Sequence, residues 1–247
     1  MRLSKCFLFV VINVFLFLTG GCFLFEKYYD GVYYYAPCWT PDGKRIYYFK
    51  NVVRVKRYLK GESYSYKYIK NKWYLCSCDT NGKNEKVILK VGERLERKWN
   101  TSLDVSNFGI VYSIDGKDGI WFCDFEGNEH EILSTGANPR WIVDSTVYDG
   151  IGIICDNTKD GGLMIMDTTG YVAIEYTQIV TFGKGASYCP ANKKILFYEW
   201  PANGYGMIYC YSIETGEIDT LIEGTHPDWA PDGEKFVYRE GAGEGLR

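Results

Sequence analysis

Few residues of this chain have the type and spacing that acid–base or ligand chemistry requires. Only two histidines occur, His130 and His226. His226 stands two residues before Asp228 in the motif His-Pro-Asp-Trp, and Asn138 stands two residues before Arg140 in the motif Asn-Pro-Arg-Trp. Two copies of one motif therefore carry an imidazole, a carboxylate, an amide and a guanidinium, a mixed set that suits a polar ligand. We take His226, Asn138, Arg140 and Asp228 as candidate binding residues, while the capping of strand ends stays open as their alternative role.

A complete catalytic set does not accompany these residues. Acyl transfer needs a nucleophile, a base and donors that stabilise developing charge, and the chain has no Gly-x-Ser-x-Gly elbow. Cys76 and Cys78 have the spacing Cys-x-Cys, a poor zinc signal without a second pair or nearby histidines. The segment 156–162 has oxygen side chains at alternate positions, as a calcium loop has, but its residue types are also ordinary in turns. We therefore predict no catalytic residue, no metal site and no cofactor.

A second candidate binding region is a stretch of basic and aromatic residues from Lys50 to Lys72. It holds eight Lys or Arg residues against the single acid Glu62. Three alternating tyrosines in it would share one face of a strand. Such a hairpin could meet anionic lipid head groups, a cell-wall polymer or an acidic protein surface, and the alternative is a hairpin that extends a sheet and has a solvated charged face. The residues of this basic–aromatic finger are Arg54, Lys56, Arg57, Lys60, Tyr64, Tyr66 and Tyr68.

Recurring turns and strands must position these residues. Pro37-Cys38-Trp39-Thr40-Pro41-Asp42-Gly43 near one end of the chain matches Pro227-Asp228-Trp229-Ala230-Pro231-Asp232-Gly233 near the other. Pro-Asp-Gly suits the centre of a tight turn, because proline presets φ and glycine accepts a positive φ. An aromatic and β-branched run follows each turn, at 45–49 and 235–238, so each motif predicts a β-hairpin.

A second hairpin is predicted in each repeat, with the turn pattern Asp-x-x-Gly. Its copies begin at Asp79, Asp124 and Asp167, with Ser212 in the fourth, so they are 45, 43 and 45 residues apart. A period of about 40 to 45 residues with four strands is typical of a β-propeller blade. The aromatic anchors of the repeats are Trp39, Trp99, Trp141, Tyr188 and Trp229. The first interval between anchors is longer, because it contains the basic–aromatic finger as an insertion.

The repeat resembles the WD40-like (PD40) repeat of the TolB propeller family, whose pattern runs Pro-x-Trp-Ser-Pro-Asp-Gly, a strand, and a strand ending in Asp-x-x-Gly. The match is best at residues 37 to 49 and 227 to 238. The resemblance implies an all-β fold over residues 35–247, a β-propeller of four-stranded antiparallel blades. It carries over no partner, because one fold serves many functions.

Four complete blades can be counted, and a fifth begins at His226. We predict a five-bladed ring in which residues 22–34 form a tether and a ring-closing strand, within the apolar run Lys27–Tyr35, because a propeller has to protect its open sheet edge. The alternative is a chain truncated within a six-bladed ring.

The first 21 residues have the character of an export signal. Two positive residues precede an apolar run over 7–18, and small residues precede Cys22. The segment resembles a bacterial lipoprotein signal peptide, which implies removal of residues 1–21 and lipidation of Cys22. The alternative is an uncleaved anchor, since the apolar stretch 6–25 is long enough to span a bilayer. Both readings place the domain outside the cytoplasm and attached to a membrane, in the periplasm or at the cell surface.

The cysteine count limits the disulfide bonds that the chain can form, and the net charge limits the class of its partners. Of nine cysteines, Cys6 and Cys22 belong to the signal segment, and the remaining seven cannot all pair. Two of them directly precede turn aspartates, where a small apolar side chain is wanted, so we predict buried free thiols. A bridge between Cys38 and Cys189 stays open. The net charge of −3 does not fit a nucleic-acid-binding protein.

These observations favour a non-catalytic, lipid-anchored β-propeller of the cell envelope that acts as a protein-binding or scaffold module. Its expected partners are the membrane, through the lipid, and an envelope protein or a cell-wall component. The alternative is a carbohydrate- or peptide-processing enzyme with a site in the propeller channel, which would require converging carboxylates or a histidine-based set.

Overall fold

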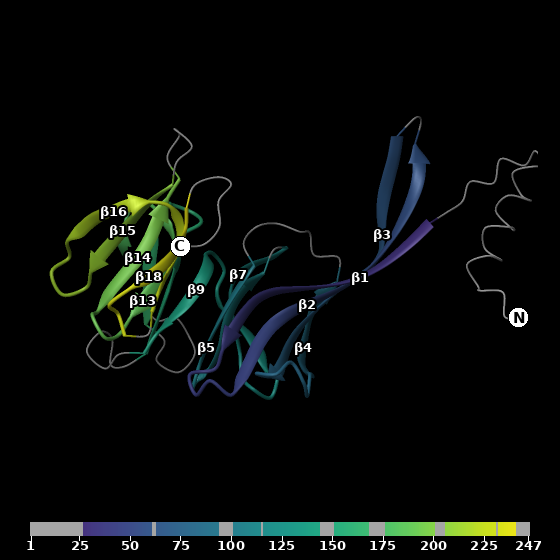
Figure 1. Ribbon diagram of the computed structural model, residues 1–247, viewed down its shortest axis with the longest axis horizontal. Helices are drawn as coiled ribbons and strands as arrows, with labels where there is room; N and C mark the ends of the chain where they lie inside the picture. The colour runs from purple at the N-terminus through teal and green to yellow at the C-terminus, as the bar shows by residue number, and fades with distance from the viewer. Residues whose placement is uncertain are drawn as a thin grey trace, which may run out of the picture. The chain divides into compact units, whose positions relative to one another are not determined.

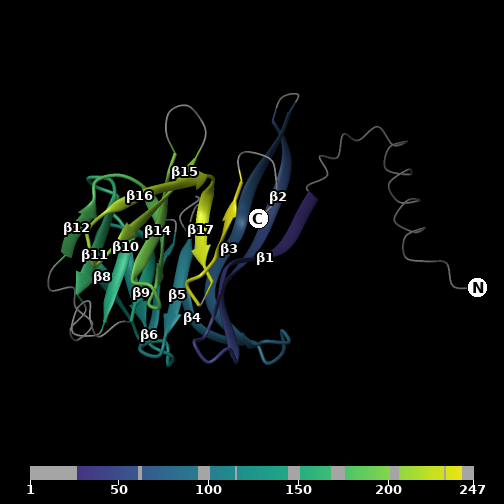
Figure 2. The ribbon, with the colours of Figure 1, turned by 60° about the vertical axis from the view of Figure 1, so that its left-hand side comes forward.

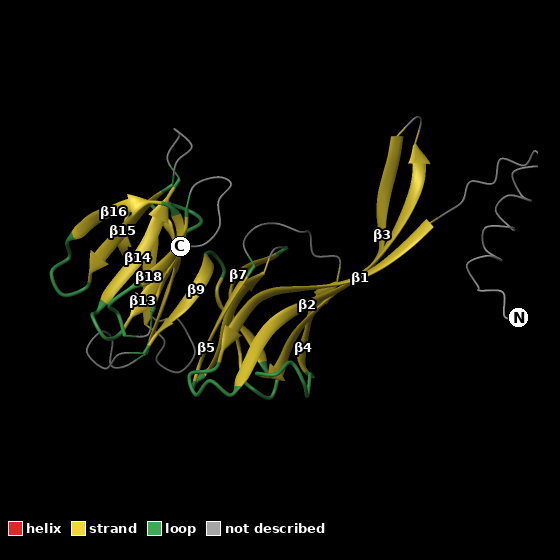
Figure 3. Ribbon diagram, in the orientation of Figure 1, coloured by secondary structure: helices red, strands yellow, loops and turns green. Residues whose placement is uncertain are grey.

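The structure is a computed structural model, and it describes residues 27–60, 63–93, 101–114, 116–143, 151–167, 176–200, 206–230 and 232–240. All regular elements in these ranges are β-strands (Figure 3), which confirms the all-β prediction. The same ranges contain no helix with the length and apolar character to cross a membrane. The predicted signal segment 1–21 and Cys22 lie outside the described residues.

The strands form four four-stranded sheets and one two-stranded sheet (Figure 1). The first sheet contains β1 (Lys27–Trp39), β2 (Arg45–Lys60), β3 (Ser63–Asp79) and β4 (Lys86–Glu93). The second contains β5 (Ser102–Ser106), β6 (Gly109–Ile114), β7 (Lys117–Cys123) and β8 (Glu129–Leu133). The third contains β9 (Ala137–Ile142), β10 (Gly152–Asp156), β11 (Leu163–Asp167) and β12 (Tyr176–Val180). The fourth contains β13 (Lys184–Cys189), β14 (Lys194–Glu199), β15 (Met207–Ser212) and β16 (Ile218–Glu223), and the fifth contains β17 (Thr225–Trp229) and β18 (Phe236–Arg239).

Each sheet is a meander, because strands that are consecutive in the chain pair side by side. This is the predicted architecture of four-stranded antiparallel blades, with four complete blades and the start of a fifth. The basic–aromatic finger is the hairpin of β2 and β3, as expected for an insertion in the first blade.

The predicted turns join these strands. In the two Pro-Asp-Gly motifs, the Gly43 N–H donates to the Thr40 carbonyl and the Gly233 N–H donates to the Ala230 carbonyl, each at 2.9 Å. Gly43 has φ 68° and Gly233 has φ 71°, a region that glycine enters without cost. The Asp-x-x-Gly turn before β4 is closed in the same way, since the Gly82 N–H donates to the Asp79 carbonyl at 2.9 Å.

The chain divides into two compact units. Unit 1 consists of Met1–Val32 and Val52–Asn71, so its described part holds the first residues of β1, the second part of β2 and the first part of β3. Unit 2 consists of Tyr33–Asn51 and Lys72–Arg247, and it contains the remainder of the blades.

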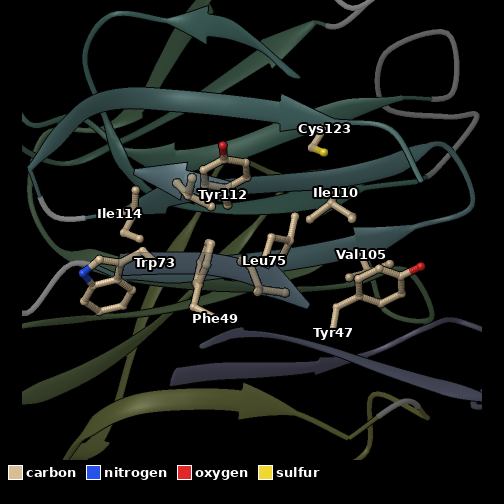
Figure 4. Packing of buried hydrophobic residues seen from close by; sticks show 11 residues of the cluster. Tyr47, Phe49, Trp73, Leu75, Val105, Ile110, Tyr112, Ile114 and Cys123 are labelled. Atoms are coloured by element: carbon tan, nitrogen blue, oxygen red, sulfur yellow. The ribbon is translucent and has the colours of Figure 1, made fainter. Parts of the chain in front are cut away.

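The core of unit 2 lies between successive sheets. Side chains alternate along a strand, so Phe49 of β2 and Leu75 of β3 face the second sheet, where Phe49 meets Tyr112 with ring centroids 5.4 Å apart (Figure 4). The neighbouring residues Tyr48 and Cys76 are buried on the opposite face of the first sheet. Full burial of one such apolar side chain contributes roughly 1.5–3 kcal/mol.

The same stacking recurs along the rest of unit 2. Phe122 of the second sheet packs against Trp141 of the third, with ring centroids 6.3 Å apart and an interplanar angle of 89°. Ile154 of the third sheet and Phe197 of the fourth belong to one buried cluster, and Tyr198 of the fourth lies in a cluster with Phe236 of the fifth. A sheet that is apolar on both faces needs neighbours on both sides, which is why the repeats occur as an array.

The strand pairing corrects one expectation about residues 22–34. The apolar run Lys27–Tyr35 belongs to β1, and β1 pairs with β2 in the first sheet. Among the described residues β18 pairs only with β17, so this run is not a strand of the fifth sheet. The reason is local, because the Pro41-Asp42-Gly43 turn joins β1 directly to β2 and a hairpin partner close in sequence costs little loop entropy.

Candidate functional site

The candidate binding residues lie on the first strands of their blades. These strands lie next to one another, β5 beside β9, β9 beside β13 and β13 beside β17. The backbone is left-handed at equivalent positions, with φ 47° at Ala36, 50° at Asn138, 65° at Gly185 and 52° at His226. Residues other than glycine rarely adopt this conformation. Its recurrence confirms that the sequence motif marks the same place in the first, third and fifth blades, and it adds Gly185 in the fourth.

Asn138 bonds to a buried carboxylate of its own blade, and this carboxylate also bonds to the fourth blade. Its side-chain Nδ2 donates to Asp156 Oδ2 at 2.7 Å, and the Gly185 N–H donates to Asp156 Oδ1, also at 2.7 Å. Asp156 is buried, and burial raises the pKa of its carboxyl to about 6, although the donors from Asn138 and Gly185 oppose the rise. The carboxylate therefore joins neighbouring blades.

Arg140 takes part in a similar link between the first three blades. Arg140 donates through a guanidinium nitrogen to the Leu103 carbonyl at 3.3 Å, and the Trp141 N–H donates to Asp104 Oδ2 at 2.8 Å. The Cys38 thiol donates to Asp104 Oδ1 at 3.4 Å. Burial raises the pKa of the Asp104 carboxyl, against the opposing charge of Arg140. Burial and the Asp104 charge raise the pKa of the Cys38 thiol to about 12, so this thiol is a poor nucleophile.

His226 and Asp228 connect the fifth blade to the fourth. The His226 ring lies 4.8 Å from the Tyr198 ring with an interplanar angle of 32°, and its Nε2 is 3.3 Å from the Tyr198 hydroxyl. The Ser187 hydroxyl donates to Asp228 Oδ1 at 2.7 Å and accepts the Trp229 N–H at 3.1 Å. Burial lowers the pKa of the His226 imidazole, and the charges of nearby cations add to the effect.

Three of the four candidates, Arg140, His226 and Asp228, therefore bond to the first or second strand of the preceding blade. The structure brings Asn138 and His226 to equivalent backbone positions, but the Asn138 side chain bonds to Asp156 of its own blade, whereas His226 lies against Tyr198 of the fourth blade. The partners Asp104 and Tyr198 were not singled out from the sequence, and Asp156 was noted only as the first residue of the segment 156–162. Among these partners, only Asp104 has a position that the repeat could have indicated. It lies on the first strand of its blade, as Arg140 and Asp228 do, although its repeat lacks the Pro-x-Trp motif.

The basic–aromatic finger makes up much of the described part of unit 1. Tyr66 and Tyr68 of β3 are 62% and 50% exposed, and Tyr28 of β1 and Tyr58 of β2 are also exposed. Lys67, Ile69 and Lys70 are exposed as well, so this part of β3 is open to solvent on both faces. The side chains of Lys60 and Tyr64 lie outside the described residues.

Charged contacts within unit 1 order the finger. Arg54 on β2 makes a two-pronged contact with Asp30 on β1, with Nε to Oδ1 at 2.7 Å and a terminal nitrogen to Oδ2 at 2.9 Å. The hydrogen bond from Arg54 lowers the pKa of the Asp30 carboxyl. Elsewhere in the unit, Arg57 and Lys27 lie 5.8 Å and 5.4 Å from the centroid of the Tyr29 ring, as cation–π contacts do.

The described residues of each unit line a hollow of a size that could hold a small group. In unit 1 a cavity of about 380 Å³ is lined by Asp30, Val32, Val52, Arg54 and Lys70, among others. In unit 2 a more open cavity of about 510 Å³ is lined mainly by residues of the first Pro-Asp-Gly turn together with Tyr47, Asp79 and Phe125. The sequence predicted neither, and none of the four candidate binding residues is among the residues that line them.

The cysteines of the described residues are free thiols, as predicted. Six are buried and Cys38 is partly exposed. Cys38 and Cys189 are both free, so the bridge between them that the sequence left open is not formed.

Comparisons with known proteins identify the fold. Scans against protein-family models and against curated protein sequences gave no match. Among solved structures, TolB from Acinetobacter baumannii has a TM-score of 0.57 and 18% identity, over 87% of this chain and 50% of TolB. The putative TolB from Agrobacterium tumefaciens has a TM-score of 0.54 and 14% identity, over 85% of this chain and 90% of that protein. A Bacteroides thetaiotaomicron protein of unknown function has a TM-score of 0.50 and 13% identity, over 85% of this chain and 57% of that one.

These likenesses and the four-stranded sheets show a TolB-like, WD40-like β-propeller fold, as the repeats predicted. At such identities the likeness concerns the fold. The chain spans half the length of the Acinetobacter baumannii protein.

Proposed function

We propose that this protein is a non-catalytic, lipid-anchored module of the cell envelope, and that its basic–aromatic finger binds an acidic surface on a protein partner. The observation that carries the proposal is the surface of unit 1, where exposed tyrosines alternate with cations on neighbouring strands. Lipidation of Cys22 and an envelope location are supported by the sequence of the first 22 residues.

The composition of this surface is that of a binding surface. Tyrosine and arginine are enriched among the residues that dominate interface energies, because each combines a large contact area with a polar group. An isolated exposed tyrosine needs no explanation, but Tyr28, Tyr58, Tyr66 and Tyr68 are gathered on three neighbouring strands of one unit.

Charge favours an acidic partner. The described side chains of unit 1 include Lys27, Arg54, Lys67 and Lys70, and the single acid described there, Asp30, is held by Arg54. A local excess of positive charge on a chain of net charge −3 attracts an acidic partner and accelerates its association.

The alternative is a carbohydrate- or peptide-processing enzyme. The carboxylates on the first and second strands count against it, since Asp104, Asp156 and Asp228 accept hydrogen bonds from neighbouring blades. A catalytic carboxylate would have to point toward a substrate.

The finger is tested by a crosslinking pull-down from envelope membranes with the full-length protein. The variant Tyr66→Ser/Tyr68→Ser is expected to recover at least about tenfold less partner than the wild type, because truncation of one interface tyrosine commonly costs more than ~1 kcal/mol. The matched control is Trp200→Ser, an exposed aromatic residue of unit 2. Equal recovery by the tyrosine variant and the control would remove the finger from the proposal.

Charge and anchoring are tested separately. Arg54→Ser/Arg57→Ser should weaken capture of the partner more strongly at low ionic strength than at high, with Lys83→Ser/Lys86→Ser in unit 2 as the control. Palmitate labelling of the protein should disappear in Cys22→Ser. If capture persists in vesicles of anionic lipid that contain no protein, the partner is a membrane surface and the proposed protein partner is wrong.

A further inference from the structure

Two cation-forming side chains lie against one tyrosine where the fourth blade meets the fifth, and a third, Arg239, lies on the strand that pairs with β17. Lys184 on β13 lies directly across from Tyr198 on β14 in the strand register, and its Nζ is 5.6 Å from the centroid of the Tyr198 ring. His226 at the start of the fifth blade lies against the same ring, with centroids 4.8 Å apart. Arg239 on β18 pairs with Thr225, the residue before His226. β14 and β17 pack together, and Figure 2 shows β14 and β17 close to each other at the green-to-yellow end of unit 2.

Tyr198 contacts two of these residues, Lys184 and His226. Its ring is buried, and a Cβ added at Gly185 would come within 2.6 Å of it, so the ring packs tightly against the β13 backbone. One face of the His226 imidazole lies against this ring, and the residue as a whole remains accessible to solvent.

The positive charge of this group is not balanced by a salt bridge. Neither Lys184 nor Arg239 forms an ion pair with a described residue. The charges that act on His226 come from Arg239 and Lys184, and both lower the pKa of its imidazole. Asp156 is the acidic residue that interacts with Lys184, and its two oxygens already accept hydrogen bonds from Asn138 and the Gly185 N–H.

We propose that Lys184, His226 and Arg239 form a binding site for a small oxyanion, the carboxylate or phosphate group of a ligand. Lys184 supplies an ammonium and Arg239 a planar guanidinium, the two groups that proteins use for oxyanions. When the Tyr198 hydroxyl donates to His226 Nε2, the proton of the neutral imidazole is on Nδ1, where it is a third donor for the anion. This site is independent of the basic–aromatic finger, because all its residues belong to unit 2.

The two histidines of the chain make the site directly measurable. We would label the full-length protein with ¹³C-histidine in detergent micelles and follow both imidazoles by NMR across pH. Titrations with inorganic phosphate, with acetate and with chloride at equal ionic strength are compared. An anion bound beside His226 stabilises its charged form, so phosphate or acetate should raise the pKa of His226 saturably above its value in chloride. His130, on β8, should respond equally to all three salts.

The three salts separate the sources of the oxyanion. A response to phosphate alone supports a phosphate-bearing ligand, and a response to both phosphate and acetate supports a carboxylate-bearing one. If His226 titrates identically in phosphate, acetate and chloride, the site does not exist.

Variants connect the response to the proposed residues. Lys184→Gln/Arg239→Gln should bind the responding anion at least tenfold more weakly, whereas Lys235→Gln, an exposed lysine just before β18, should bind it as the wild type does. The charge-preserving Lys184→Arg/Arg239→Lys should keep the saturable response, which shows that a loss in the glutamine variant is a loss of charge and not of folding. An unchanged affinity in the glutamine variant would overturn the proposal.

Discussion

Replacement of Asp156 by asparagine should change the stability of the protein in a pH-dependent way. Asp156 is buried and accepts hydrogen bonds from Asn138 Nδ2 and the Gly185 N–H. An asparagine of nearly the same shape can still accept the Gly185 N–H through its Oδ1. The amide of Asn138 can turn over so that its own oxygen accepts from the new Nδ2. The variant therefore removes the ionisation and keeps most of the contacts.

The size of the effect follows from the pKa of the carboxyl. Burial raises this pKa from 3.8 to about 6 in the folded protein. Between these two values the folded state binds more protons than the unfolded state, so the wild type loses stability as the pH rises through this window. Since one pKa unit corresponds to about 1.4 kcal/mol, the loss is ~2.5 kcal/mol between about pH 4 and pH 7.5.

The assay is denaturant unfolding of the wild type and of Asp156→Asn, followed by tryptophan fluorescence at a series of pH values. The free energy of unfolding of the variant is subtracted from that of the wild type at each pH, which cancels the titration of all other groups. This difference should fall by ~2.5 kcal/mol from about pH 4 to pH 7.5. The control is Asp160→Asn, an exposed aspartate of the same turn, which separates the loss of a buried carboxyl from the loss of any aspartate in this turn.

A difference for Asp156→Asn that is independent of pH, or that grows as the pH rises, would refute the reasoning. The first result would mean that Asp156 ionises in the folded protein as it does in the unfolded chain. The second would mean that the donors from Asn138 and Gly185 outweigh burial and make the charged carboxylate the stabilising form.

Three further predictions concern the backbone and the thiols. Gly162→Ala should destabilise the protein by at least ~2 kcal/mol more than Gly82→Ala in denaturant unfolding. Both glycines have positive φ, but only at Gly162 would an added methyl group overlap the Val180 carbonyl oxygen. Equal losses of stability in the two variants would contradict this prediction. Ala36→Gly should raise the free energy of unfolding by about 0.5–1 kcal/mol, because the left-handed conformation at φ 47° costs an L-residue roughly 1–2 kcal/mol. A lower melting temperature for the glycine variant would count against this prediction. Iodoacetamide should label Cys38 before the six buried thiols. The labelling of Cys38 should be slow at neutral pH, because the pKa of its thiol is about 12. Uniform labelling of the cysteines in mass spectrometry would disprove the assigned burial.

The candidate site shows where sequence reasoning reaches its limit. The motif spacing correctly placed Asn138 and His226 at equivalent positions, because the same short motif produces the same left-handed backbone in each copy. The hydrogen-bond partners of these residues could not be predicted in the same way. Asp156 lies 29 residues before Gly185, and Ser187 lies 41 residues before Asp228, so each contact depends on how one blade packs against the next.

The sequence by itself determined the repeating unit of this protein. Turn residues, alternating apolar runs and a period of about 45 residues are local properties, and together they specify hairpins and four-stranded blades whatever the distant parts of the chain do. The two-residue period of a strand likewise places Tyr66 and Tyr68 on one face of β3.

The tertiary structure decided what those units contact. It placed β1 beside β2 and not in the fifth sheet, paired Arg54 with Asp30, and brought Lys184 and His226, which are far apart in the sequence, to the same Tyr198 ring. Such contacts depend on the register of paired strands and on the packing between blades, and these are fixed by the summed burial of many side chains and not by any single motif.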